Sequence, residues 1–142
     1  MDRNLQILGL AKKAGLLAIG AEDTVAASKV GKAKLIVSAC DASESALRRA
    51  QFCSQIGCAL HIEAPFSSFQ LGTVSGRGSP STVSILDTGL AARFLEGLAQ
   101  TDPKRFSGAA SLLANEARAK KQTSSLSKKK RSTITDKRRT VQ

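Results

Sequence analysis

Hydrophobic and polar positions in the first hundred residues follow two alternating spacings. Apolar side chains recur every three or four positions, the spacing of amphipathic helices, in residues 2–14, 20–30 and 44–57. Short continuous apolar runs, which are typical of buried strands, occupy residues 34–39, 59–62 and 82–86. A further short apolar run, 16–19, separates the first two helices. Because helices alternate with strands, the pattern predicts crossover connections and an α/β fold.

Glycine and small polar residues mark the ends of the predicted helices. Gly15 ends the first helix, and Gly31 follows the second, where a left-handed C-terminal cap is expected. Residues 41–44 form a turn that caps the third helix. Asp87 or Thr88 caps the last helix of the alternating part. Each helix therefore has a recognisable stop or start signal of its own.

A short fourth helix is expected between the last two strands. Pro65 suits its first turn, and Phe66, Phe69 and Leu71 would be its apolar positions. We expect this helix to end in the glycine-rich stretch 72–80, because glycine lowers helix stability. That stretch would then be the connection to the last strand.

The composition changes near residue 100. Residues 1–100 carry ten basic and eight acidic side chains, whereas residues 101–142 carry twelve basic and three acidic ones. We predict a three-layer α/β/α sandwich with a small mixed sheet in residues 1–100 and a basic, largely disordered C-terminal tail in residues 101–142. Within the tail, residues 108–121 can form one helix, and residues 122–142 are expected to be disordered because they have almost nothing apolar to bury.

The net charge of +11 is the feature of the sequence that most restricts the possible binding partners. Since most of this charge lies in the tail, it indicates a polyanionic partner. The tail has no aromatic residue after Phe106, which favours RNA or DNA over a membrane surface. The chain has no secretory signal pattern and no run of about 18 apolar residues that could cross a membrane. We therefore expect a cytoplasmic protein with reduced thiols.

Residues that could build a catalytic or metal centre are scarce. The single histidine, His61, falls on a predicted buried strand, where a structural role is more frequent than base catalysis. Cys40, Cys53 and Cys58 lack the paired spacing of a zinc site, and one histidine cannot complete it. We expect a protein that is not an enzyme, has no cofactor and takes no small-molecule substrate.

Two stretches could nevertheless hold a ligand. The glycine-rich residues 72–79 lack the Lys-Ser/Thr ending of a P-loop, and a plain connection is the simpler interpretation, although backbone N–H groups and Arg77 could hold phosphates. Glu22 and Asp23 lie in a first helical turn, where carboxylates complement the helix dipole. They could instead accept hydrogen bonds from the base edge of an unstacked guanine in RNA.

A series of short motifs between residues 3 and 98 resembles a known family. The motifs are LGLAKKAG (8–15), IGAE (19–22), GKAKLIV (31–37), DAS (41–43), LGTVSG (71–76) and LDTGLA (86–91). In this order they resemble the ribosomal protein L-seven-Ae family, and its bacterial YlxQ-like branch most closely. The resemblance implies an α/β/α sandwich that binds structured RNA, often a kink-turn, and that associates with the ribosome.

The resemblance also implies a set of RNA-contacting residues. In such families the start of the second helix meets sheared G·A pairs, and two loops enclose the flipped nucleotide. These elements correspond here to residues 20–24, 39–43 and 72–80. The implied RNA-binding residues are Gly20, Ala21, Glu22, Asp23, Lys29, Lys32, Asp41, Leu71, Gly72 and Arg77, with Lys34 as a weaker candidate.

Three positions depart from the residue types usual in kink-turn binders. Glu22 stands where Asn or Lys is usual, Ala26 where Lys is usual, and Cys40 where an acidic residue is usual. We therefore expect structured RNA as the partner and leave open whether it is a kink-turn. Two other functions also stay open: a small-ligand or nucleotide-binding domain that uses residues 72–79, and an adaptor whose tail binds an acidic protein.

Overall fold

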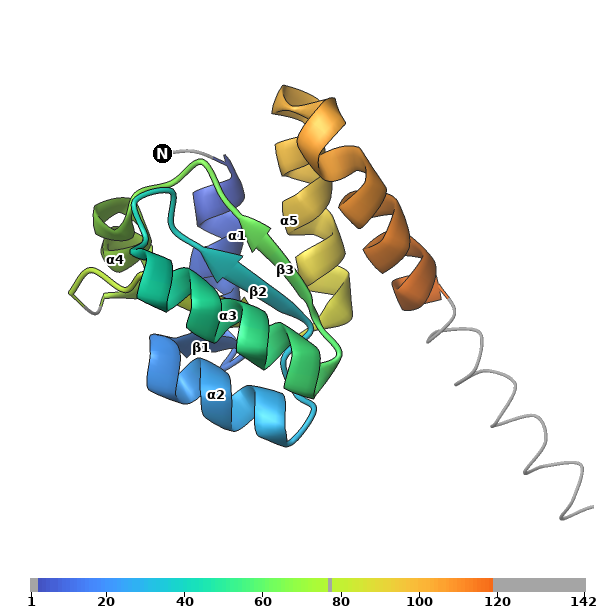
Figure 1. The fold of residues 1–142 in the computed structure, drawn as a ribbon. Coiled ribbons are helices and arrows are strands. Elements are labelled where there is room, and N and C mark those ends of the chain that lie inside the picture. The colour runs from blue at the N-terminus through green and yellow to red at the C-terminus, as the bar shows by residue number, and fades with distance from the viewer. Residues whose placement is uncertain (1–2, 77, 119–142) are drawn as a thin grey trace, which may run out of the picture.

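The computed structural model describes residues 3–76 and 78–118 (Figure 1). In chain order its elements are α1 (Arg3–Lys13), β1 (Leu17–Ile19), α2 (Ala21–Lys29), β2 (Leu35–Ser38), α3 (Glu44–Gly57), β3 (Leu60–Glu63), α4 (Ser68–Ser75), β4 (Thr82–Ile85) and α5 (Thr88–Thr101). Another helix occupies residues 103–118, where the described part ends. The predicted alternation of helices and strands is confirmed, and the apolar run 16–19 contributes β1.

The four strands form one mixed sheet in the order β1-β4-β2-β3. Both β1 and β2 run antiparallel to β4, so that Ala18 and Ile36 lie opposite Ser84. β2 and β3 are parallel, with Ile36 opposite His61. These directions place the ends of β1, β2 and β3 and the start of β4 at one end of the sheet, which we call the exit end.

Helices cover both faces of the sheet, which confirms the predicted three-layer α/β/α sandwich (Figure 1). One layer consists of α1, α4, α5 and the helix 103–118, and the other consists of α2 and α3. Successive strand residues point to opposite faces. Leu35 and Val37 therefore enter the first layer, whereas Ile36 between them enters the second.

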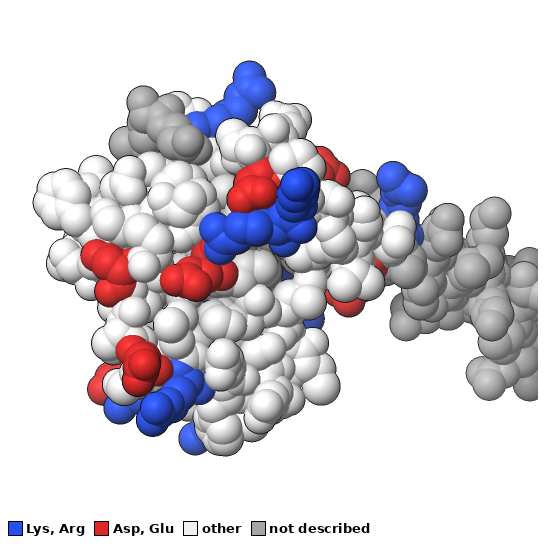
Figure 2. All heavy atoms as spheres, turned by 45° about the horizontal axis from the view of Figure 1, so that its top comes forward, with Lys and Arg blue, Asp and Glu red and all other residues white. Residues whose placement is uncertain are grey.

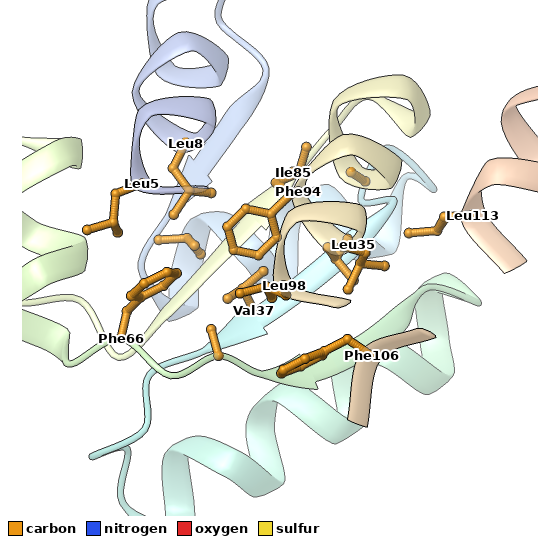
Figure 3. Packing of buried hydrophobic residues seen from close by; sticks show 14 of the residues in the cluster. Leu5, Leu8, Leu35, Val37, Phe66, Ile85, Phe94, Leu98, Phe106 and Leu113 are labelled. Atoms are coloured by element: carbon orange, nitrogen blue, oxygen red, sulfur yellow. The ribbon is translucent and has the colours of Figure 1, made fainter. Parts of the chain in front are cut away.

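The larger core lies between the sheet and the layer of α1, α4 and α5 (Figure 3). The rings of Phe66 and Phe94 pack against each other in it, with centroids 6.4 Å apart and planes tilted by 56°. Phe106 and Leu113, both from the helix 103–118, are buried in the same cluster. The packed core thus continues past residue 100 into the segment that the charge pattern assigns to the tail.

The helix 103–118 begins earlier than the predicted residue 108 because its first turn has good capping residues. Pro103 occupies the first helical position, where its missing N–H costs nothing. The Asp102 carboxylate accepts a hydrogen bond from the Arg105 N–H at 3.4 Å. Arg105 also donates to the Glu63 carbonyl at 2.8 Å, which fastens the helix to the end of β3. Residues 122–142, which are predicted to be disordered, lie outside the described residues, as do the last three residues of the predicted helix 108–121.

The second core, between the sheet and α2 and α3, is built from small side chains. Its members are Ala18, Ala27, Ala33, Ile36, Ala50, Cys53 and Ala59. Small residues let α2 and α3 approach closely: a Cβ added at Gly57 would lie 3.1 Å from the Ser28 carbonyl oxygen. The larger apolar residues Phe52 and Ile56 of α3 are exposed on the outer surface, because Ala50 and Cys53 occupy the face of this helix that enters the core.

The fourth helix differs most from its prediction. Pro65 and Phe66 precede α4, which starts after Ser67 because Ser67 and Gln70 form a capping box there. The helix continues through Gly72 and ends at Gly76, whose backbone is left-handed (φ 72°). The predicted loop 72–80 is therefore shorter: residues 72–75 belong to α4, and the described part of the connection to β4 is residue 76 and residues 78–81.

The other predicted helix ends are confirmed. Gly15 and Gly31 have positive φ angles of 73° and 74°, which favour glycine after a helix. Ser43 caps α3 by accepting a hydrogen bond from the Ala46 N–H at 3.2 Å. Asp87, one of the two predicted residues, caps α5 by accepting from the Leu90 N–H at 2.9 Å.

Two adjacent leucines test whether the helix 103–118 belongs to the core. Leu113 is 1% exposed and Leu112 is 55% exposed. We expect Leu113→Ala to lower the free energy of unfolding by about 2–5 kcal/mol, because it leaves a cavity in the core. The matched change Leu112→Ala should cost less than about 1 kcal/mol. Urea denaturation of both variants makes the measurement, and equal small losses would show that this helix is not packed on the sheet.

Candidate nucleic-acid interface

Three segments that are distant in sequence meet at the exit end of the sheet. They are the start of α2 (residues 20–24), the loop after β2 (residues 39–43) and the described part of the loop before β4 (residue 76 and residues 78–81). The Gly20 N–H donates to the Thr82 carbonyl at 2.9 Å, and the Ala39 N–H donates to the Ser81 carbonyl at 2.8 Å. The start of β4 therefore holds the other two segments on either side of it.

Asp41 ties the loop 39–43 to the start of α4. Its Oδ1 accepts a hydrogen bond from the Ser68 N–H at 2.9 Å, and its Oδ2 accepts from the Ser68 hydroxyl at 3.1 Å. Next to it, the Cys40 N–H donates to the Phe66 carbonyl at 2.9 Å. The structure therefore places Asp41 at the exit end, as the resemblance implies, and both its oxygens are engaged in positioning the loop.

Leu71 and Gly72 lie in α4, and Gly72 is in close contact with Gly78 of the loop that follows this helix. Leu71 is fully buried in the larger core, so its side chain is not available to a partner. Gly72 is buried as well, and a Cβ there would collide with the Gly78 carbonyl oxygen. Any larger residue at position 72 would push the loop off α4. Of these two predicted site residues, neither offers a side chain to RNA, but Gly72 sets the position of the loop.

Lys12 is a basic residue at this loop that the sequence did not single out. It lies in the last turn of α1, and its Nζ is so close to Gly76 that an added Cβ would be 2.7 Å from it. Lys12 falls within the motif at residues 8–15, but nothing in the pattern shows that α1 ends beside the loop 76–81. The contact depends on the tertiary packing of α1 against α4.

The start of α2 presents both donors and acceptors. Its N-cap residue, Gly20, has a φ of 90° and no side chain, so the first-turn N–H groups are not capped from that position. Glu22 and Asp23 follow and are exposed, whereas Ala21 is half-buried and Thr24 is buried. Backbone N–H groups and carboxylates thus stand side by side at the exit end.

The predicted basic residues are spread more widely than the other site residues. Lys29 is in the last turn of α2 and lines a groove between α2 and α3 that also includes Glu22. Lys32 and Lys34 follow α2 at the opposite end of the sheet, where the Lys34 N–H donates to the Ile85 carbonyl at 2.9 Å. Arg77 lies outside the described residues. The structure therefore does not bring Lys32 together with Gly20 and Asp41.

Charges of both signs share the surface seen in Figure 2. Basic and acidic side chains are interspersed there, and the surface between them is formed by uncharged residues. On this face the described residues form no continuous basic area. Most of the excess positive charge belongs to the sequence of residues 101–142, which carry twelve basic and three acidic side chains.

His61 has a structural hydrogen bond. Its Nε2 lies 2.7 Å from the Ser38 hydroxyl oxygen on the neighbouring strand β2. Burial lowers the pKa of His61, and the nearby Glu63 carboxylate raises it in part.

Among the residues that the structure describes, no three His, Cys, Asp or Glu side chains are grouped so that they could hold a metal ion. Within the same residues, no helix is both long and apolar enough to traverse a bilayer.

Comparisons with known proteins identify the fold. No protein family model matches the chain, and no curated protein matches it either. Among solved structures, a protein of unknown function from Bacillus halodurans is similar at 21% identity, with a TM-score of 0.61, over 68% of this chain and 97% of that one. A 15.5 kDa RNA binding protein from Giardia lamblia is similar at 18% identity, with a TM-score of 0.55, over 68% of this chain and 82% of that one. The sandwich of this chain is thus a fold that other proteins share.

Proposed function

We propose that the protein binds structured RNA with the exit end of its sheet. The described part of the contact surface consists of residues 20–24, 39–43, 76 and 78–81. The observation that carries the proposal is their joint attachment to the start of β4 by the hydrogen bonds of Gly20 and Ala39. The fold shared with an RNA binding protein supports it, as does the sequence resemblance to a ribosomal protein family.

The chemistry of this surface suits base edges better than phosphates. Glu22 and Asp23 repel phosphate groups but can accept hydrogen bonds from base amino and imino groups, while first-turn N–H groups can donate to base acceptors. Paired bases of an A-form duplex expose little of these edges to protein side chains. The favoured partner is therefore an RNA with unpaired or non-standard pairs, and a kink-turn is the first candidate.

The cellular setting follows from the same proposal. We place the protein on ribosomal RNA, in the cytoplasm of a bacterium, because its motifs resemble those of ribosomal proteins. We infer that it acts by binding and catalyses no reaction.

The alternative of a nucleotide site in residues 72–79 is less favoured, since residues 72–75 lie inside α4, where their N–H groups are part of the helical backbone. An adaptor that binds an acidic protein remains the other alternative.

Removing the Glu22 carboxylate distinguishes base recognition from phosphate contact. We expect Glu22→Ala to weaken binding of a kink-turn RNA by about 10- to 100-fold, the value of a hydrogen bond to a charged group. A straight duplex should be bound slightly more tightly because repulsion is removed. Fluorescence anisotropy at one salt concentration measures both, with Glu96→Ala on α5 as a control of equal charge. Tighter binding of every RNA by Glu22→Ala would contradict base recognition.

Asp41 should matter through the loop that it positions. Asp41→Ala removes both hydrogen bonds to Ser68, so we expect a loss of about 1 kcal/mol in stability and about tenfold weaker binding of the structured RNA. Ser68→Ala, which removes one of the two bonds, should lose less of both. Thermal unfolding and anisotropy make the measurements. Unchanged RNA binding by a folded Asp41→Ala protein would exclude the loop 39–43 from the interface.

The tail should raise the affinity for every RNA by a similar factor, without preferring one RNA structure over another. If about six of its charges contact phosphates, they contribute roughly −4 to the salt slope for single-stranded RNA, at about −0.7 per charge. A chain truncated after Arg118 should therefore bind all RNAs more weakly and with a shallower salt dependence. Its ratio of affinities for kink-turn and duplex should stay the same. If that ratio falls to one, recognition belongs to the tail and not to the folded part.

A further inference from the structure

A groove runs between α2 and α3 on the outside of the molecule. Its volume is about 560 Å³, and its lining includes Ala21, Glu22, Val25, Lys29, Arg49 and Phe52. It starts at the first turn of α2, which also belongs to the proposed RNA surface, and extends to the last turn of that helix. The groove is therefore a continuation of the exit end along the α2 and α3 layer.

Phe52 is the unusual residue of this groove. Three of the five phenylalanines, Phe66, Phe94 and Phe106, are buried in the larger core, whereas Phe52 is 54% exposed and Phe69 on α4 is 74% exposed. Of the two exposed rings, only that of Phe52 lines the groove. Ala50 and Cys53 are the residues of α3 that enter the second core, so Phe52 lies on another face of that helix. An exposed aromatic face beside a groove is a surface on which a nucleic-acid base can stack, whatever the identity of the base.

Two cations flank the ring. Arg49 precedes Phe52 by one helical turn, and Lys29 stands across the groove on α2. Within residues 3–76 and 78–118, neither Arg49 nor Lys29 forms a salt bridge. The ion pair on α3 joins the neighbouring Arg48 to Glu44. Arg49 also lines a small pocket with Ala21 and Thr82, so it stands between the groove and the exit end. Both cations are thus available to phosphates.

We propose that this groove binds one unpaired nucleotide of the RNA held at the exit end. The base stacks on Phe52, and the adjoining phosphates contact Arg49 and Lys29. This inference rests on the proposed function, since the groove receives a nucleotide that flanks the recognised RNA. It extends the interface to α3, which neither the sequence motifs nor the resemblance implicates.

A protein partner fits the groove less well. Val30 and Ile56 are exposed nearby and would suit an apolar partner. However, two cations and the Glu22 carboxylate lie in the groove itself, and they would lose their hydration under an apolar protein surface. A nucleotide offers both a stacking base and phosphates, so it matches the ring and the cations together.

Crosslinking maps the nucleotide directly. The full chain is mixed with a kink-turn RNA that carries a short single-stranded flank containing 4-thiouridine, irradiated, digested and analysed by mass spectrometry. We expect a crosslinked peptide that contains Phe52. Crosslinks in residues 39–43 or 76–81 without any in α3 would overturn this inference and leave the proposed function standing. Crosslinks confined to residues 119–142, or none at all, would overturn both.

Matched variants of the full chain add an affinity measurement. We expect Phe52→Ala to weaken binding of the flanked RNA by about 5- to 100-fold and to leave binding of the unflanked RNA unchanged, while Phe52→Tyr keeps both affinities. Arg49→Glu should weaken binding of the flanked RNA more than Arg93→Glu on α5, which changes the charge equally. If Phe52→Ala leaves RNA binding intact and instead disrupts self-association in sedimentation, the groove is a protein contact and the proposal is wrong.

Discussion

The carbonyl groups of Ser81 and Thr82 are the constraint on which the candidate interface depends. They accept hydrogen bonds from Ala39 and Gly20, which come from two different strand ends. Both bonds are possible because β4 lies between β1 and β2 and runs antiparallel to each of them. A sheet with another strand order would leave the start of α2 and the loop 39–43 apart. Topology therefore creates the surface, and the side chains on it decide what binds.

The two helical layers differ in the size of their core residues. Leucine and phenylalanine fill the layer of α1, α4 and α5, and the helix 103–118 completes it with Phe106 and Leu113. The layer of α2 and α3 packs on alanines, one cysteine and Ile36. Ala50 and Cys53 take the inward face of α3, and the ring of Phe52 is exposed on another face, beside the surface that we assign to RNA.

Local signals predicted the fold well but the site only in part. Helix ends at Gly15, Gly31 and Asp87 were predictable because caps and left-handed glycines act within a few residues. The extent of α4 was not, since the capping box of Ser67 competes with the signal of Pro65, and a glycine inside a helix is indistinguishable from one in a loop. The membership of residues 103–118 in the core was hidden because the charge of residues 101–142 was counted together, and most of that charge follows residue 118.

The resemblance implies Gly20 and Asp41 as site residues, and the structure places both at one end of the sheet; their contact with RNA stays a prediction. Leu71, by contrast, is a core residue, since a motif does not distinguish residues that contact a partner from those that support the loop. The contributions of Lys12 and Arg49 could not be predicted because they arise where one helix lies beside a distant segment. Contacts of this kind depend on tertiary packing, which no short pattern encodes.

A nuclear magnetic resonance titration of the ¹⁵N-labelled full chain with a kink-turn RNA tests the interface residue by residue. At a salt concentration that suppresses weak phosphate contacts, we expect amide shifts to change at the start of α2, in residues 39–43 and in residues 76–81 together. Resonances of α5, on the other layer, should stay in place. If saturating RNA moved the amides of residues 119–142 and left those three segments unchanged, the exit end of the sheet would not be the interface.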